Sequence, residues 1–351
     1  MLAPVTHYLP LTTIVRERLL PLPGRVTVRL NQKVSATDVI AEASLAREHV
    51  LLDVARSLGI SADAADRLIK CKVGDKLAQN TIVAEGGGLL PREMRVPREG
   101  RVVAVGGGQI LLEVGDTGFA LRAGLPGLVT KIIPERGAII QTSGALIQGL
   151  WGNGRVDAGL MLNLAEKPDD VLAASRLDVS LRGSVILGGP CRDAETLRAA
   201  AELPVRGLIL SSILPLLIPL ALQMRYPIVV IDGLGHFPMN PVARKILSTN
   251  SKREVALNAE PYDRYTGARP EVIIQLPITQ EPLEPRDAET FAPGQQVRLR
   301  RAPHAGAVGT LVALRSGLTT LPSGLRAVAG EVRLEGGEQI LVPLVNLEVI
   351  G

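Results

Sequence analysis

The sequence predicts a multidomain fold that is β-rich with one α/β part, and three observations carry that prediction. At 351 residues the chain exceeds what one ordinary hydrophobic core holds. Hydrophobic residues make up 46% of it and aromatic residues only 2%, so its cores must be built from Val, Ile, Leu and Ala. The 36 glycines and 25 prolines indicate many turns between short strands.

An internal repeat supports the β-rich part. Residues 28–43, VRLNQKVSATDVIAEA, return 43 residues later as 71–86, CKVGDKLAQNTIVAEG, so that Lys33 falls on Lys76. A looser third copy is expected at 131–147. Each copy reads as a short strand, a turn and an apolar strand, which is the unit of a small quasi-symmetric barrel or sandwich.

Between the first two copies the pattern predicts an αα-hairpin over 48–70. Apolar residues at 50, 51, 54, 55 and 58 mark one helix, which Gly59 ends, and Ser61 caps a second. The segment also reads like the opening of a helix-turn-helix. Asp63 and Asp66 make its second helix unsuitable for reading DNA, so the favoured interpretation is a hairpin that covers one end of the barrel.

The short motifs that follow resemble a known family. Val-Gly-Asp-Lys-Leu at 73–77, Ile-Val-Ala-Glu at 82–85, Gly-Arg-Val-Val at 100–103 and Ile-Leu-Leu-Glu-Val at 110–114 are similar to the barrel-sandwich hybrid of biotinyl and lipoyl carriers, over residues 25–150. Carriers present a modifiable lysine at a hairpin tip, where this chain has glycines at 106–108. The resemblance therefore implies a non-carrier module without a cofactor. We assign it to 24–156, after an N-terminal segment 1–23 that does not read as a signal peptide.

Residues 157–279 alternate between strand and helix patterns. Strands are expected at 184–187, 205–211, 227–231, 254–257 and 272–276, with helices at 193–201 and 215–224. This alternation predicts a small α/β domain with a parallel sheet, of the three-layer or the swivelling type. Its apolar run at 207–222 is too short for a bilayer and contains Pro215 and Pro219, so we expect no membrane insertion.

The last part follows a Pro/Glu-rich linker at 280–290. Residues 291–351 show short alternating strands with a Gly306-x-x-Gly309 turn and a closing Val-Pro-x-x-Asn-Leu-Glu segment. This pattern resembles a KOW motif in an SH3-like β-barrel, as found in NusG-type transcription factors and ribosomal proteins. The resemblance implies a nucleoprotein assembly as partner.

Two groups of residues are candidates for a functional site. Parallel sheets bind ligands at the carboxyl ends of their strands, which favours a ligand site at Gly188, Gly189, Cys191, Asp232 and His236, where Cys191 could act as a nucleophile. Tight turns, with Asp193 as a helix cap, explain the same residues without a ligand. A second group, which could hold phosphates or another partner, comprises Arg298, Arg300, Arg301 and His304. An ordinary solvated barrel face is the alternative for that group.

The remaining composition narrows the function. The four histidines lie at 7, 49, 236 and 304 without metal-ligand spacing, and no nucleotide-binding or serine-hydrolase motif occurs, so we expect no metal and no cofactor. Two cysteines fit a reduced, cytoplasmic setting. The leading hypothesis is a non-enzymatic scaffold that binds a protein partner, with nucleic acid possible through the C-terminal part. The competing hypothesis is a ligand-binding or catalytic α/β domain.

Overall fold

The computed structural model describes residues 2–44, 48–87, 92–115, 118–263, 266–277, 285 and 288–351. The chain divides into two compact units. The larger one holds Met1–Leu19, Thr27–Ile40 and Arg122–Gly351, and the smaller one holds Leu20–Val26 and Ala41–Leu121. Several sheets make up the described residues and none of these sheets closes into a barrel. The prediction of a β-rich chain is therefore confirmed, and the division into two units agrees with a multidomain organisation.

An eleven-stranded sheet forms the centre of the larger unit. Its strands β16 to β19 run parallel and the others antiparallel. The sheet crosses the expected domain boundary at 156/157, because β16 begins at Val156 and β21 pairs with β14. In spatial order the strands are β15 (Trp151–Gly152), β19 (Ile228–Leu234), β18 (Gly207–Ile213), β17 (Ser184–Leu187), β16 (Val156–Asn163), β20 (Glu254–Asn258), β21 (Glu271–Gln275), β14 (Gly137–Gln148), β13 (Gly127–Ile133) and β4 (Lys33–Val34), with β2 (Tyr8–Leu19) paired to β14.

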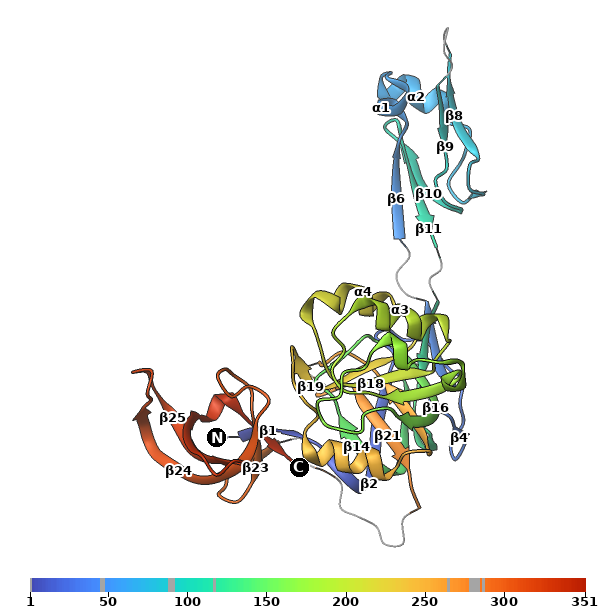
Figure 1. Ribbon diagram of the computed structural model, residues 1–351. Helices are drawn as coiled ribbons and strands as arrows, with labels where there is room; N and C mark the ends of the chain where they lie inside the picture. The colour runs from blue at the N-terminus through green and yellow to red at the C-terminus, as the bar shows by residue number, and fades with distance from the viewer. Residues whose placement is uncertain are drawn as a thin grey trace. The chain divides into compact units, whose positions relative to one another are not determined.

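Helices cover the parallel strands, whose side chains alternate between two cores. Ile186, Leu208 and Val230 pack with α3 (Ala194–Glu202) and α4 (Ile218–Gln223), which lie together in Figure 1. The residues next to them in the strands, among them Leu187, Ile209 and Val229, point to the other side of the sheet and pack with α5 (Pro241–Thr249). Short 3-10 helices occupy Ala174–Arg176, Val179–Leu181, Pro215–Leu217 and Leu344–Asn346.

Most elements of this α/β part were predicted. All five expected strands and both expected helices are present, with ends that differ by a few residues. Helix α5 was missed, although Asn240 caps it by accepting a hydrogen bond from the backbone N–H of Ala243 (2.8 Å) and Pro241 begins it. None of the helices in the described parts of the chain is long and apolar enough to cross a bilayer.

The smaller unit contains the second repeat. A four-stranded sheet runs β6 (Glu48–Asp53), β11 (Gln109–Val114), β10 (Gly100–Gly106), β7 (Lys76–Leu77), next to a hairpin of β8 (Ile82–Gly86) and β9 (Arg92–Arg95). The expected αα-hairpin over 48–70 is only partly present. Residues 48–53 form strand β6, because Val50 and Leu52 alternate toward the core and pair with β11, and the helices are α1 (Val54–Leu58) and α2 (Ala62–Leu68).

The repeat is visible as two copies of one strand arrangement. The second copy runs β6-β11-β10-β7, and the first runs β2-β14-β13-β4. A separate three-stranded sheet has the order β12 (Gly118–Arg122), β5 (Val39–Ser44), β3 (Arg25–Val26). The second copy is inserted in sequence between β5 and β12 of the first. Residues 131–147, expected as a third copy, instead supply the end of β13 and most of β14 in the first copy.

The C-terminal sheet uses both ends of the chain. Its order is β22 (Ala288–Thr290), β1 (Leu2–Thr6), β27 (Leu347–Ile350), β23 (Gln296–Leu299), β24 (Val308–Thr320), β25 (Arg326–Leu334), β26 (Gln339–Pro343). Strand β1, from the segment expected to precede the domains, pairs in parallel with β27, and Figure 1 shows it among the C-terminal strands. Of the expected linker 280–290, residues 280–284, 286 and 287 lie outside the described residues, and 288–290 form β22.

Candidate functional site

The two expected ligand-binding segments flank the end of β18. Cys191 donates its backbone N–H to the carbonyl oxygen of Ser212, and Gly235 donates to that of Ile213, both at 2.9 Å. The segment 188–191 therefore extends the sheet on one side of β18, and the segment 232–236 lies on the other. Their backbones meet at the carboxyl edge of a parallel sheet, and the chemistry depends on where the side chains point.

Cys191 points into a hydrophobic core. Its side chain is fully buried among apolar residues that include Leu172 and Ile213. Burial raises the pKa of the thiol to about 12, and the charge of Asp193 adds to the rise. A nucleophilic cysteine needs the opposite shift, because the thiolate is the reactive form. The local environment of Cys191 thus stabilises the neutral thiol.

The neighbouring glycines and Asp193 have structural contacts. A Cβ on Gly189 would lie 2.0 Å from the carbonyl oxygen of Asp170, and one on Gly188 would lie 3.0 Å from the Leu172 side chain. Asp193 caps α3 by accepting a hydrogen bond from the backbone N–H of Thr196 (2.7 Å). These contacts agree with the tight-turn interpretation, in which glycine is required by close packing.

Two buried serines at the end of β18 hold the loop after β19. The hydroxyls of Ser211 and Ser212 both donate to the carbonyl oxygen of Phe237, at 2.8 and 2.9 Å. The Phe237 backbone N–H donates to Ser212 Oγ at 3.0 Å. His236, directly before Phe237, is exposed. This clamp fixes Phe237 and leaves the imidazole in solvent.

Asp232 lies at a bulge in β19. Between Leu210 and Ser212 of β18 the register with β19 shifts from Val230 to Gly233, so β19 holds one extra residue there. Bulges redirect side chains. Asp232 accepts hydrogen bonds from the backbone N–H and the side-chain amide of Asn240, at 2.9 and 2.7 Å. Burial raises the pKa of Asp232, although its contacts with Arg298 and Asn240 oppose the rise.

Arg298, expected on an exposed face of the C-terminal part, is instead buried at 2% exposure. It forms ion pairs with Glu348 and with Asp232 (Oδ1 at 3.3 Å), and donates hydrogen bonds to the Tyr8 hydroxyl (2.8 Å) and the Ile231 carbonyl oxygen (3.2 Å). Burial alone would lower its pKa, but these neighbours raise it, so the guanidinium stays charged. Arg298 joins the C-terminal sheet to strands β19 and β2 of the central sheet.

A cleft of about 510 Å³ lies beside this network. Four of the expected site residues line it: Asp232 from one group, and Arg298, Arg300 and Arg301 from the other. Arg301 is exposed, and Arg300, half exposed, lies 3.9 Å from Glu348. The remaining five, Gly188, Gly189, Cys191, His236 and His304, are not among its lining residues.

Apolar residues also line the cleft. Phe237 lines it and packs against Gly306, where an added Cβ would lie 2.9 Å from the phenyl ring. Gly306 also has φ +84°, which side chains rarely adopt. The sequence showed Gly306 only as part of a turn motif, and nothing in the pattern identified Phe237 as its partner.

Within the described ranges no group of three or more His, Cys, Asp and Glu side chains could hold a metal ion. The chain matches no protein-family model. It also matches no protein among those with curated descriptions.

Proposed function

We propose that this protein is a non-enzymatic binding protein that holds an anionic partner in the cleft between its central and C-terminal sheets. The observation that carries the proposal is the exposure of Arg300 and Arg301 at a cleft whose third arginine, Arg298, is fully engaged in structural contacts. Adjacent arginines with exposed guanidinium groups suit phosphate or carboxylate oxygens.

The contacts of the α/β residues support binding over catalysis. Cys191 is buried as a neutral thiol, Asp232 is occupied by Asn240 and Arg298, and Ser211 and Ser212 clamp a loop. General acid–base or nucleophilic catalysis needs such a group within reach of a substrate and with a suitable pKa. Asp232 and the two serines instead make contacts that hold the cleft wall and the segment that carries Phe237, and Cys191 lies in a hydrophobic core.

The resemblance of 291–351 to KOW modules suggests the class of partner. We propose that the partner belongs to a transcription or translation assembly and that its nucleic acid phosphates bind Arg300 and Arg301. Neutralising a phosphate releases counterions, so the binding constant should fall as the salt concentration rises. On a log–log plot the slope should be steeper by about 0.7–0.9 for each phosphate that the two arginines neutralise.

Affinity capture from native lysate, with and without nuclease, tests this proposal. The double variant Arg300→Glu/Arg301→Glu should lose the wild-type partners. The control Arg326→Glu/Arg333→Glu makes the same charge change at exposed residues of the same sheet that do not line the cleft, and it should retain them. Unchanged capture by the first variant would show that the cleft is not the docking surface. Partners that resist nuclease would place the contact on protein.

A further inference from the structure

The two copies of the repeat have the same backbone frame, which makes each a control for the other. Asn31 of the first copy donates its N–H to Val129 O at 2.8 Å, and Gly74 of the second donates to Val102 O at the same distance. Both hairpins carry a register shift at the equivalent place, after Val129 and after Val102. Because the same backbone forms with either set of side chains, a side chain that differs between equivalent positions of the two copies is not needed to form this backbone.

One row across the outer face of the sheet differs sharply between the copies. In the second copy neighbouring strands place Lys76, Arg101 and Glu113 side by side. In the first copy the equivalent row is Lys33, Leu128 and Gln141. The lysine is common to both, whereas the arginine and the glutamate occur only in the second copy.

Without a bound anion, the like charges of Lys76 and Arg101 destabilise the folded state of the second copy. Directly opposite residues on paired strands have Cβ atoms about 4.5–5.5 Å apart, and like charges there are destabilising. The first copy avoids this cost with Leu128. Glu113 forms an ion pair through its Oε2 with Arg101 Nε at 3.5 Å, whereas across the described part of the chain Lys76 has no ion-pair partner.

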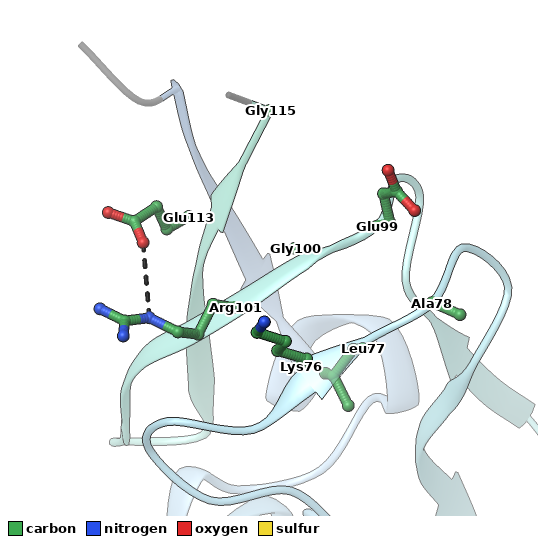
Figure 2. A pocket seen from close by; sticks show the side chains of 8 residues that line it. All are labelled: Lys76, Leu77, Ala78, Glu99, Gly100, Arg101, Glu113 and Gly115. Atoms are coloured by element: carbon green, nitrogen blue, oxygen red, sulfur yellow. Dashed lines mark ion pairs between the residues drawn. The ribbon is translucent and has the colours of Figure 1, made fainter. Parts of the chain in front are cut away.

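A cavity lies at this row. Lys76, Arg101 and Glu113 line a hollow of about 740 Å³, together with Glu99 and the backbone at Gly100. Figure 2 shows Lys76 and Arg101 on neighbouring strands, with the dashed ion pair leading from Arg101 to Glu113. Glu113 engages Nε, and among the described residues the two terminal nitrogens of Arg101 have no ion-pair partner, with its side chain 51% exposed. The volume is within the usual range for small-molecule sites.

We infer that the second copy binds a phosphorylated small molecule in this cavity, with the phosphate between Lys76 and Arg101. A dianion there converts the repulsion between the two cations into two charge-assisted contacts, a fork from the guanidinium and a point charge from the ammonium. This site is separate from the proposed docking cleft and rests only on the second copy. The first copy, with Leu128 in place of the arginine, lacks the pair that would hold the phosphate.

Isothermal titration of the full chain with inorganic phosphate and with glucose 6-phosphate tests the inference. Arg101→Leu installs the residue that the first copy carries on the same frame, so the variant should fold, and it should bind both ligands at least tenfold more weakly. Arg98→Leu removes an equal charge from the same copy, at an exposed residue outside the cavity lining that pairs with Glu48, and it should bind like wild type. Equal affinity of wild type and Arg101→Leu, or an equal loss in both variants, would overturn the site. Urea midpoints measured beside each titration report whether the fold is intact.

Discussion

Arg298 of β23 and Asp232 of β19 form a buried ion pair, with Nη1 and Oδ1 3.3 Å apart and both side chains almost inaccessible to solvent. The pair lies between the C-terminal sheet and the central sheet. Two residues that the sequence assigned to separate candidate sites therefore hold one wall of the same cleft. Their charges are used for assembly of the fold, which leaves Arg300 and Arg301 as the cations that a partner can reach.

The first prediction concerns Arg298→Met. Removing the guanidinium leaves Asp232 and Glu348 buried without their cation, which typically costs about 3–5 kcal/mol of folding free energy. Arg300→Met, at a half-exposed residue beside it, should change stability by less than about 0.5 kcal/mol. Urea denaturation of both variants measures the difference, and similar small losses would show that the buried network contributes little.

The second prediction concerns the contact of Gly306 with Phe237. Gly306→Ala should be more destabilising than Gly337→Ala. Both glycines have nearly equal φ, +84° and +86°, which costs an alanine about 1–2 kcal/mol, but only at Gly306 would the new Cβ meet a side chain. The extra loss at Gly306 should be about 1–3 kcal/mol.

The double variant Gly306→Ala/Phe237→Ala separates these contributions. If the phenyl ring causes the extra loss, the alanine at 306 should cost no more in the Phe237→Ala background than Gly337→Ala costs in wild type. An undiminished cost there would place the strain elsewhere in the loop. Equilibrium unfolding of the four variants completes this cycle.

The sequence predicted those strands and helices that a pattern within a few consecutive residues identifies. The apolar runs of β17, β18 and β19 and the spacing of α3 were sufficient to place those elements. Burial of Arg298 could not be predicted in this way, because its partner Tyr8 is 290 residues away and an arginine next to another arginine reads as a solvated face. Strand β1 was missed for a similar reason, since its partners β22 and β27 lie at the other end of the chain.

The repeat shows the same limit. Identical and similar residues at matching positions predicted the first two copies. The assignment of 131–147 as a third copy was wrong because the apolar strands of a hairpin, here β13 and β14, have similar sequences even when they are not part of a repeat. The contrast between Arg101 and Leu128 becomes meaningful only when the register shows that they occupy equivalent positions. The sequence match between the copies covers only 28–43 and 71–86, so it ends before Leu128 of the first copy and Arg101 of the second.

The third prediction concerns pH. Burial by itself would raise the pKa of Glu260, but hydrogen bonds and the charge of Arg18, with Nη1 at 2.5 Å and Nη2 at 2.6 Å, hold it below the ordinary value of 4.5. A lowered carboxyl pKa stabilises the fold above the unfolded value and loses that effect as the pH falls through the folded value. The stability difference between wild type and Glu260→Gln should therefore be constant above about pH 5.5 and shrink below pH 4.5. A difference that does not vary with pH would contradict this assignment.

The fourth prediction concerns β1. Val5 is buried in the C-terminal core and pairs with Val349, whereas Leu2 of the same strand is 71% exposed. Val5→Asp should destabilise the protein by at least ~2 kcal/mol, because it buries a charge without a partner. Leu2→Asp should have less than about a quarter of that effect. Hydrogen exchange of the amides of β27 measures the loss locally, and equal protection in both variants would mean that the C-terminal sheet does not depend on β1.

The last prediction separates a binding protein from a cysteine enzyme. With its thiol fully buried and its pKa raised to about 12, Cys191 should react with iodoacetamide only when the fold opens. Labelling of the native protein should be at least ~100-fold slower than in denaturant, since even ~5 kcal/mol of stability suppresses opening further than that. Raising the pH from 7 to 9 should speed both reactions by a similar factor, because the native protein reacts only through its open state, in which the exposed thiol ionises as in the denatured chain. Peptide mass spectrometry reads each cysteine separately. If Cys191 of the native protein were labelled fast, and equally fast with and without the captured partner, the thiol would be reactive and the catalytic alternative would be favoured.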